Sequence, residues 1–397
     1  MRASFYPSLL LLLTIGATPA VALEADLSLL LQNELRAIAD SPINPNNQNF
    51  GLPSRLHQAE FRAELRQALG PVDLTARPRA WADVARVNGS DTSGADLFFQ
   101  EAFLKIQAHE NISLSVGRIQ FGWGPAESVT PSNWLAPEIQ LEPSPYFQQL
   151  GYNRAQANIT IGQGFSLVAA GELQPLPDHF GTREFPAEVF RKRSFAKAEW
   201  NWDNANKVFG VVGGRERRAA GDLWRAGAYG SLTLSDAWQL YFDGAWRESR
   251  PGGGGDPFVV AGARYTLEGG AEFHAEGIRN QGAGRNRAGS VSGYGDLTLS
   301  ELLVNRGTAL LNRDYAFLSF GWPNAPIFPS WAQTPVLYLR ALHSIGDHST
   351  ALLFTTEIGF RDHYTVGLYG AAGFGPNASE MRQIYDGLLG FVGKINF

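Results

Sequence analysis

The sequence is built from segments of about ten residues in which apolar and polar side chains alternate. In the segment 238–246 (WQLYFDGAW) the even positions are mostly large and apolar, whereas the odd positions include Gln239 and Asp243. A period of two places these two sets on opposite faces of a β-strand. Trp238 and Trp246 share the apolar face at roughly 20 Å of height in a tilted strand, which matches the two aromatic girdles of a transmembrane β-barrel.

The chain also ends on this pattern. Leu389, Phe391, Gly393 and Ile395 share one face with Phe397, which is the last residue. An aromatic end on an amphipathic strand is similar to the signal by which the barrel-assembly machinery selects its substrates. We therefore expect Phe397 to be an assembly signal and that machinery to be a partner of the chain.

Seventeen alternating segments occur between residues 56 and 397. Bacterial single-chain barrels have an even number of strands, so we expect 16 strands with one false segment or 18 with one missed. The composition agrees, because charged residues are only 18% of the chain and no apolar stretch after residue 22 approaches the ~20 residues of a transmembrane helix. The predicted fold class is all-β: a transmembrane antiparallel β-barrel of 16–18 strands over residues 51–397.

The first 50 residues differ from the rest. Arg2, a short apolar run and an A-x-A cleavage site ending at Ala22 form a secretory signal over residues 1–22. We expect export through the Sec pathway and integration into the cell outer membrane. Residues 23–50 are predicted to be an N-terminal periplasmic segment with a short helical element over 24–40.

The lengths of the connections alternate, which predicts the orientation of the barrel. Short turns lie in the periplasm and long connections lie outside the cell in such barrels. We place four short connections in the periplasm: 109–111, 162–164, 203–206 and 235–236. We place four long connections outside: 122–151, 175–191, 248–256 and 280–311.

The sequence has little that points to an enzyme. It contains neither an H-E-x-x-H zinc pattern nor a G-x-S-x-G nucleophile elbow. His179 beside Asp178 could act as a base, but histidines are common in loops. We predict no enzyme, no metal site and no cofactor. Loss of Arg2 with the signal takes the formal charge from −5 to −6, and an acidic chain argues against nucleic acid as a partner.

Ionisable residues of both signs are predicted to point into the barrel from the alternation within their segments. Nine are singled out: Arg62, Arg66, Lys105, Arg154, Lys197, Glu199, Asp243, Arg247 and Arg340. In an open pore such opposed charges would set a transverse field and tune selectivity. In a plugged barrel they would pair with one another, and the sequence leaves both interpretations open.

Basic residues also gather at the expected strand tops and outer connections. They are Arg191, Arg193, Arg215, Arg217, Arg218, Arg285 and Arg287. Positive charge outside a net-acidic chain suggests an anionic partner. The phosphates of lipopolysaccharide, which any outer-membrane barrel meets along with the membrane lipid, fit this description, and so does an anionic surface polysaccharide.

The most distinctive stretch reads VGRIQFGWGPAESVTPSNWLAP. Local roles can explain its residues. Trp123 can anchor at the membrane interface, while Gly124 and Pro125 stop the strand. Ser132 and Asn133 can then nucleate a turn.

The same stretch resembles the Wzi-like capsule-assembly family of outer-membrane barrels, which carry a W-G-P-G strand end followed by an S-N-x-x-x-P segment. The helical leader of that family is similar to residues 31–40 here (LQNELRAIAD), although Ala126 stands in place of the second glycine of the strand end. The resemblance implies a barrel that binds or organises exported polysaccharide without catalysis. It implies a ligand-binding outer loop that contains Trp123, Gly124, Pro125, Ser132 and Asn133.

Two functions therefore remain open. The first is capsule-assembly-like binding of surface polysaccharide, which the basic clusters and the W-G-P stretch favour. The second is a general or weakly selective porin for passive diffusion of small solutes, which the lumen charges favour.

Overall fold

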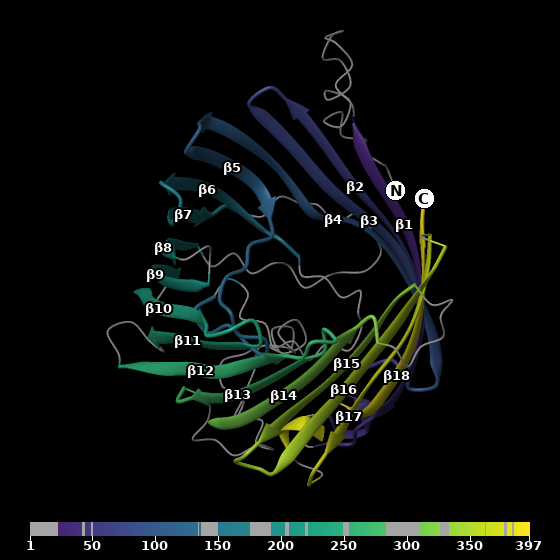
Figure 1. The fold of residues 1–397 in the computed structure, drawn as a ribbon. Coiled ribbons are helices and arrows are strands. Elements are labelled where there is room, and N and C mark those ends of the chain that lie inside the picture. Colours follow the sequence, from purple (N-terminus) through teal and green to yellow (C-terminus); the bar gives the residue numbers. More distant parts are fainter. Residues whose placement is uncertain are drawn as a thin grey trace.

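The computed structural model is one closed barrel of eighteen antiparallel strands (Figure 1). It describes residues 23–41, 44–48, 51–133, 135, 150–174, 192–202, 206–218, 221–248, 254–282, 310, 312–325, 333–361, 363–376, 379–382 and 385–397. The strands are β1 Glu24–Ile38, β2 Arg55–Leu69, β3 Val72–Val87, β4 Ser90–His109, β5 Ile112–Ile119, β6 Tyr152–Ile161, β7 Phe165–Glu172, β8 Arg193–Trp202, β9 Lys207–Arg218, β10 Gly221–Thr233, β11 Trp238–Glu248, β12 Gly255–Thr266, β13 Glu272–Asn280, β14 Asp314–Pro323, β15 Gln333–Ser344, β16 Ser349–Phe360, β17 Tyr364–Phe374 and β18 Tyr385–Asn396, with short 3-10 helices η2 Pro45–Asn47 and η4 Glu380–Arg382. Each strand pairs with its neighbours in sequence, and β1 pairs with β18, so the sheet closes on itself. The all-β barrel class is confirmed at the upper strand count.

Strand β1 occupies the residues for which a helix was expected, so the helical prediction is wrong. Leu31 and Leu35 are exposed on the outer face of β1, whereas Leu30 and Glu34 are buried on its inner face. The strand forms ladders with β2 on one side and β18 on the other. Helix propensity is a weak preference, and two complete ladders outweigh it. β1 is the strand missing from the seventeen expected segments; the expected signal, residues 1–22, lies outside the described residues.

Alternation within the strands sorts apolar side chains to the outside of the barrel. In β11, Trp238, Leu240 and Phe242 are exposed on the outer face, while Tyr241 and Asp243 are buried inside. Exposed leucine, valine and aromatic side chains recur on strands all around the wall. A continuous apolar surface of this kind is stable against lipid rather than water. No helix in the described part of the chain is long and apolar enough to cross a membrane.

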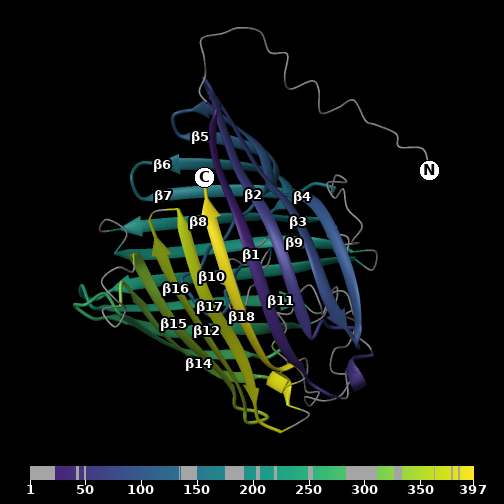
Figure 2. The same ribbon diagram turned by 90° about the vertical axis from the view of Figure 1, so that its right-hand side faces the viewer.

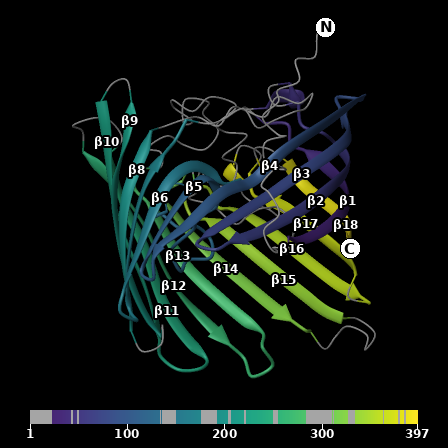
Figure 3. The ribbon, with the colours of Figure 1, turned by 90° about the horizontal axis from the view of Figure 1, so that it is seen from above.

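The two ends of the barrel differ in their connections. β1 begins and β18 finishes at the same end (Figure 2), where the turns 70–71 and 110–111 are also found. The long connections 120–151 and 281–313 leave from the opposite end, in agreement with the expected alternation of lengths. The turns 88–89 and 345–348 depart from this rule, because both are short and lie at the long-connection end. Between the two ends the strands are strongly tilted (Figure 3).

One cross-strand contact recurs three times on the inner wall. In each, a tyrosine ring lies across a glycine of the next strand, and its hydroxyl donates to a glutamate in register on the strand beyond. The three sets are Tyr241–Gly262–Glu276, Tyr229–Gly210–Glu199 and Tyr369–Gly390–Glu34. A Cβ on each glycine would collide with the tyrosine ring, so the contact requires glycine.

Candidate functional site

The chain turns into the barrel after β5 ends at Ile119. We call residues 120–133 and 135 the inward segment, which runs through the space inside the ring of strands (Figure 1). Gly117 has φ +131°, and a Cβ there would collide with the backbone of Ala102, so this backbone conformation close to the end of β5 requires glycine. The described part of the expected outer loop 122–151 therefore lies in the lumen instead.

Trp123 is the first anchor of the inward segment. Its side chain is only 7% exposed and packs on the inner faces of β7, β8 and β9, against residues such as Val168 and Val212. Its ring centroid lies 5.3 Å from that of Phe195 and 5.4 Å from that of Phe121. The expected position of Trp123 at the membrane interface is wrong, because the large ring is buried inside the lumen.

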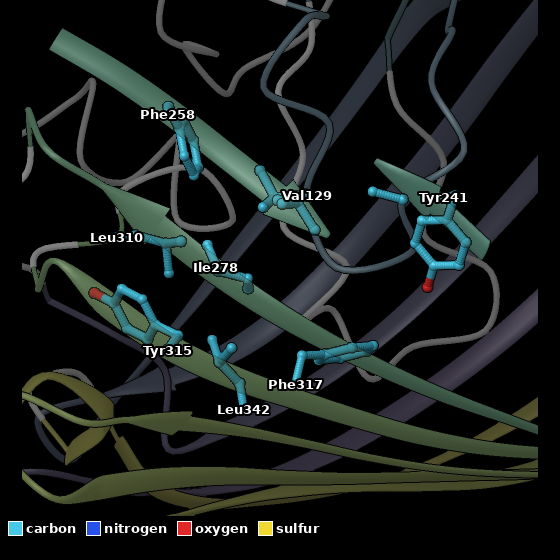
Figure 4. Close-up of a cluster of buried hydrophobic side chains, with 10 residues drawn as sticks. Val129, Tyr241, Phe258, Ile278, Leu310, Tyr315, Phe317 and Leu342 are labelled. Carbon is cyan, nitrogen blue, oxygen red and sulfur yellow. The ribbon is translucent and has the colours of Figure 1, made fainter. Parts of the chain in front are cut away.

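Val129 is the second anchor. It is 1% exposed and belongs to a buried apolar cluster with Tyr241, Val260, Phe317 and Leu342 (Figure 4). These partners come from β11, β12, β14 and β15, so the segment crosses from one part of the inner wall to another between its two anchors. Burial of this apolar area holds the segment against the wall.

Asp243 joins two points of the inward segment. Its carboxylate is fully buried and accepts hydrogen bonds from the Ser132 N–H at 2.7 Å and the Ser132 Oγ at 3.0 Å. Gly124 has φ +95°, and a Cβ there would collide with the same carboxylate. Ser132 lies on Gly227 of β10, where an added Cβ would come within 2.9 Å of the Ser132 Cβ. Gly124 and Ser132 of the W-G-P…S-N stretch therefore allow the inward segment to lie close to the wall.

Glu276 of β13 accepts four hydrogen bonds. Its Oε1 accepts from the Glu127 N–H at 2.7 Å and from the Tyr241 hydroxyl at 2.8 Å. Its Oε2 accepts from the Ser128 N–H at 3.1 Å and from the Ser128 hydroxyl. Three of these four donors belong to the inward segment, so Glu276 fixes the deepest part of that segment through its backbone.

The side chain of Glu127 contacts three neighbouring strands. Ser319 Oγ donates to its two oxygens at 2.8 and 2.9 Å, His274 Nδ1 lies 2.9 Å away, and Arg340 Nε lies 3.4 Å away. Burial favours the neutral acid, but the hydrogen bonds from His274 and Ser319 and the positive charges of His274 and Arg340 outweigh it. The pKa of Glu127 is therefore held below its usual value.

Ion pairs form a ladder on the inner faces of β2 and β3. Glu60 pairs with Arg62 at 2.9 Å and with Arg79 at 3.2 Å. Arg77 pairs with Glu64 at 3.0 Å, and both side chains are 28% exposed. This part of the wall remains accessible to water while its charges largely compensate one another.

The strand registers place the nine predicted lumen residues on the inner face: Arg62, Arg66, Lys105, Arg154, Lys197, Glu199, Asp243, Arg247 and Arg340. Lys197 contacts Glu199 at 3.0 Å and Tyr229 Oη at 3.1 Å. The guanidinium of Arg154 lies 4.7 Å from the ring centroid of Phe121, so it faces the inward segment. Their roles in conduction remain predictions.

The predicted basic surface at the outer connections is not brought together among the described residues. Arg193 turns into the barrel, is buried, and pairs with Glu172 at an Nε–Oε1 distance of 3.2 Å, so its expected outward position is wrong. Arg215 and Arg217 pair with Asp222 at 3.0 and 3.7 Å on the outer face. Arg191, Arg285, Arg287 and the side chain of Arg218 lie outside the described residues.

The predicted site residues omitted Glu127, Ser128 and Tyr241. The parity of β11 could have placed Tyr241 on the inner face beside Asp243. No local pattern distinguishes Glu127 and Ser128 from other loop residues, because their partners are almost 150 positions away in the chain, at sequence separations of 149 and 148.

Three solved structures are similar to this barrel over nearly their whole length. The crystal structure of Pseudomonas aeruginosa OccK7 (OpdD) matches with a TM-score of 0.52 and 13% identity, covering 94% of this chain and 98% of that one. OccK2 (OpdF) of the same organism, in complex with glucuronate, matches with a TM-score of 0.51 and 15% identity over 94% and 98%. The outer membrane protein OpdK of P. aeruginosa gives 0.52 and 11% over 94% and 99%. No protein-family model and no curated protein matches the chain.

These findings overturn the resemblance to Wzi-like capsule-assembly barrels. The similar structures are Occ and Opd proteins, and the W-G-P…S-N stretch is explained by the approach of Gly124 and Ser132 to Asp243. A short motif with a packing role can arise in unrelated barrels, because close approach to a wall needs small residues in any of them. The chain therefore has the eighteen-stranded barrel fold that it shares with these Occ and Opd proteins.

Proposed function

We propose that the chain is an outer-membrane channel for passive diffusion of small hydrophilic solutes, without catalysis. The observation that carries this proposal is the inward segment. Its anchors at Trp123 and Val129 hold it against β7 to β9 and β11 to β15, so it narrows the lumen from one side. The ion-pair ladder on β2 and β3 stays partly exposed to water. An ordered constriction facing a polar wall is an arrangement that can sieve solutes.

The charges support weak rather than strong selectivity. Carboxylates and guanidiniums alternate on the inner wall and compensate one another in pairs such as Glu60 with Arg62. Weak charge selectivity would admit neutral and singly charged solutes of small size. Glucuronate, the ligand of the similar OccK2 structure, is a suitable charged probe, with glucose as its neutral counterpart.

The surroundings of the barrel follow from its outer face. Membrane lipid would contact the exposed apolar side chains, and lipopolysaccharide phosphates would meet Arg215 and Arg217 beside Trp224 at the long-connection end. In this proposal the chain is exported through the Sec pathway and inserted into the outer membrane by the barrel-assembly machinery.

Single-channel conductance in planar bilayers tests the proposal. Refolded protein that migrates as a heat-modifiable barrel should give steady channels, and liposomes that contain it should swell in glucose and in glucuronate. Boiled protein serves as the matched control. A folded barrel that shows neither conductance at modest voltage nor liposome swelling would overturn the proposal.

A further inference from the structure

Glu276 is a buried carboxylate held by hydrogen bonds alone. It is 4% exposed, and the described residues supply it with four hydrogen-bond donors and no ion pair. A buried charge with no counterion is costly, and it persists only where donors satisfy its lone pairs. The four donors therefore give Glu276 a role in holding its neighbours in place.

We propose that Glu276 is a positioning residue that holds the inward segment in the lumen through both of its carboxylate oxygens, and so sets the cross-section of the pore. This inference rests on the proposed channel function. The backbone N–H of Glu127 points at one carboxylate oxygen and the backbone N–H of Ser128 at the other. A backbone N–H can only donate, so both oxygens of Glu276 must accept a hydrogen bond to hold the segment.

Replacement by glutamine exposes this requirement. In either orientation of the amide that E276Q introduces, its NH₂ group faces one of the two backbone N–H groups of Glu127 and Ser128. One buried donor then loses its acceptor, which shifts the equilibrium toward a detached segment by about 5- to 150-fold.

Glu34 offers a matched control in the same kind of tyrosine–glycine–glutamate contact. It accepts from the Tyr369 hydroxyl at 2.8 Å, as Glu276 does from Tyr241, but its other donors are the side chains of Gln32 and Arg36 on its own strand. E34Q therefore changes a buried carboxylate in the same way while it leaves every contact of the inward segment in place.

The first measurement is single-channel recording of wild type, E276Q and E34Q, all shown to be heat-modifiable barrels. Wild type should show few transitions to a wider state. E276Q should occupy the wider state more often and admit larger sugars in liposome swelling. E34Q should follow wild type.

The second measurement keeps the inference separate from the channel function. Hydrogen exchange of the Glu127 and Ser128 amides should speed up in E276Q but not in E34Q. If wild type fails to conduct, the channel function is wrong while exchange still tests the positioning role of Glu276. Equal exchange and equal channel states in E276Q and E34Q would overturn the inference. E276D, whose shorter side chain withdraws the carboxylate from the two backbone N–H groups, replaces E276Q if that variant does not fold.

Discussion

At the scale of single residues, the inner wall depends on glycines that make room for other side chains. Gly210, Gly262 and Gly390 each lie beneath a tyrosine ring, and each tyrosine reaches a glutamate on the far side. The sheet thereby gains a cross-strand hydrogen bond that spans three strands. The loss in strand propensity is offset by the buried aromatic contact.

A glycine-to-alanine pair tests this contact. G390A should destabilise the barrel by about 1–3 kcal/mol, because the new methyl group displaces the Tyr369 ring from Glu34. G393A is the control, since a Cβ there meets no heavy atom within 4 Å. Urea unfolding of both variants in detergent measures the difference, and equal stability of the two variants would contradict the role given to Gly390.

Glu127 gives a prediction on pH. Because its pKa is lowered in the folded state, ionised Glu127 stabilises the fold fully above the ordinary carboxylate pKa of about 4.3. This contribution is lost as the pH falls through the lowered folded pKa. The stability difference between wild type and E127Q should therefore persist at about pH 5 and shrink below about pH 4. Thermal unfolding of the two proteins across pH checks this, and a difference that vanishes near pH 6 would contradict it.

At the scale of elements, the closing strand pair depends on the last residue. Phe397 donates its backbone N–H to the Leu27 carbonyl at 3.0 Å, and its ring is 71% exposed on the lipid-facing side. The same residue thus extends the β1–β18 ladder and presents an aromatic ring at the short-turn end.

Deletion of Phe397 should lower the yield of folded barrel in the outer membrane severalfold, whereas F397Y should assemble like wild type. The ladder bond to Leu27 and the terminal aromatic ring are both lost in the deletion, and both are kept in F397Y. Heat-modifiable migration of membrane fractions gives the yield. Normal assembly of the truncated chain would show that the terminal aromatic is not an assembly signal here.

At the scale of the whole molecule, an engineered disulfide can join the inward segment to the wall. The chain contains no cysteine that could compete for this bond. A Cβ at Gly227 would lie 2.9 Å from the Ser132 Cβ, near the distance of about 3.5–4.5 Å between the Cβ atoms of a disulfide. The double variant S132C/G227C should therefore form a disulfide after a small shift. Oxidised protein should conduct like wild type with fewer transitions, and reductant should restore them. Blocked conductance in the oxidised form would mean that the open state has this segment elsewhere.

The sequence by itself determined the barrel, its seventeen later strands and the division of its faces. Alternation such as that of 238–246 is a local property of the chain, since each residue's face is set by parity alone. The inward direction of Asp243 and Lys197 followed from the same rule. The rule did not identify residues 24–38 as a strand, because this leucine-rich run with polar positions fits the period of a helix as well as that of a strand. Pairing with β18 and β2 decides in favour of the strand.

Tertiary structure alone decided where the inward segment lies and what holds it. Ser132 meets Asp243 across 111 positions of sequence, and Ser128 meets Glu276 across 148. Such contacts depend on which strands the closed barrel brings opposite each other, and on the space that glycines such as Gly227 leave in the wall. A local pattern carries no information on either, so Trp123 and Ser132 were recognisable as distinctive residues but not as parts of a segment folded into the lumen.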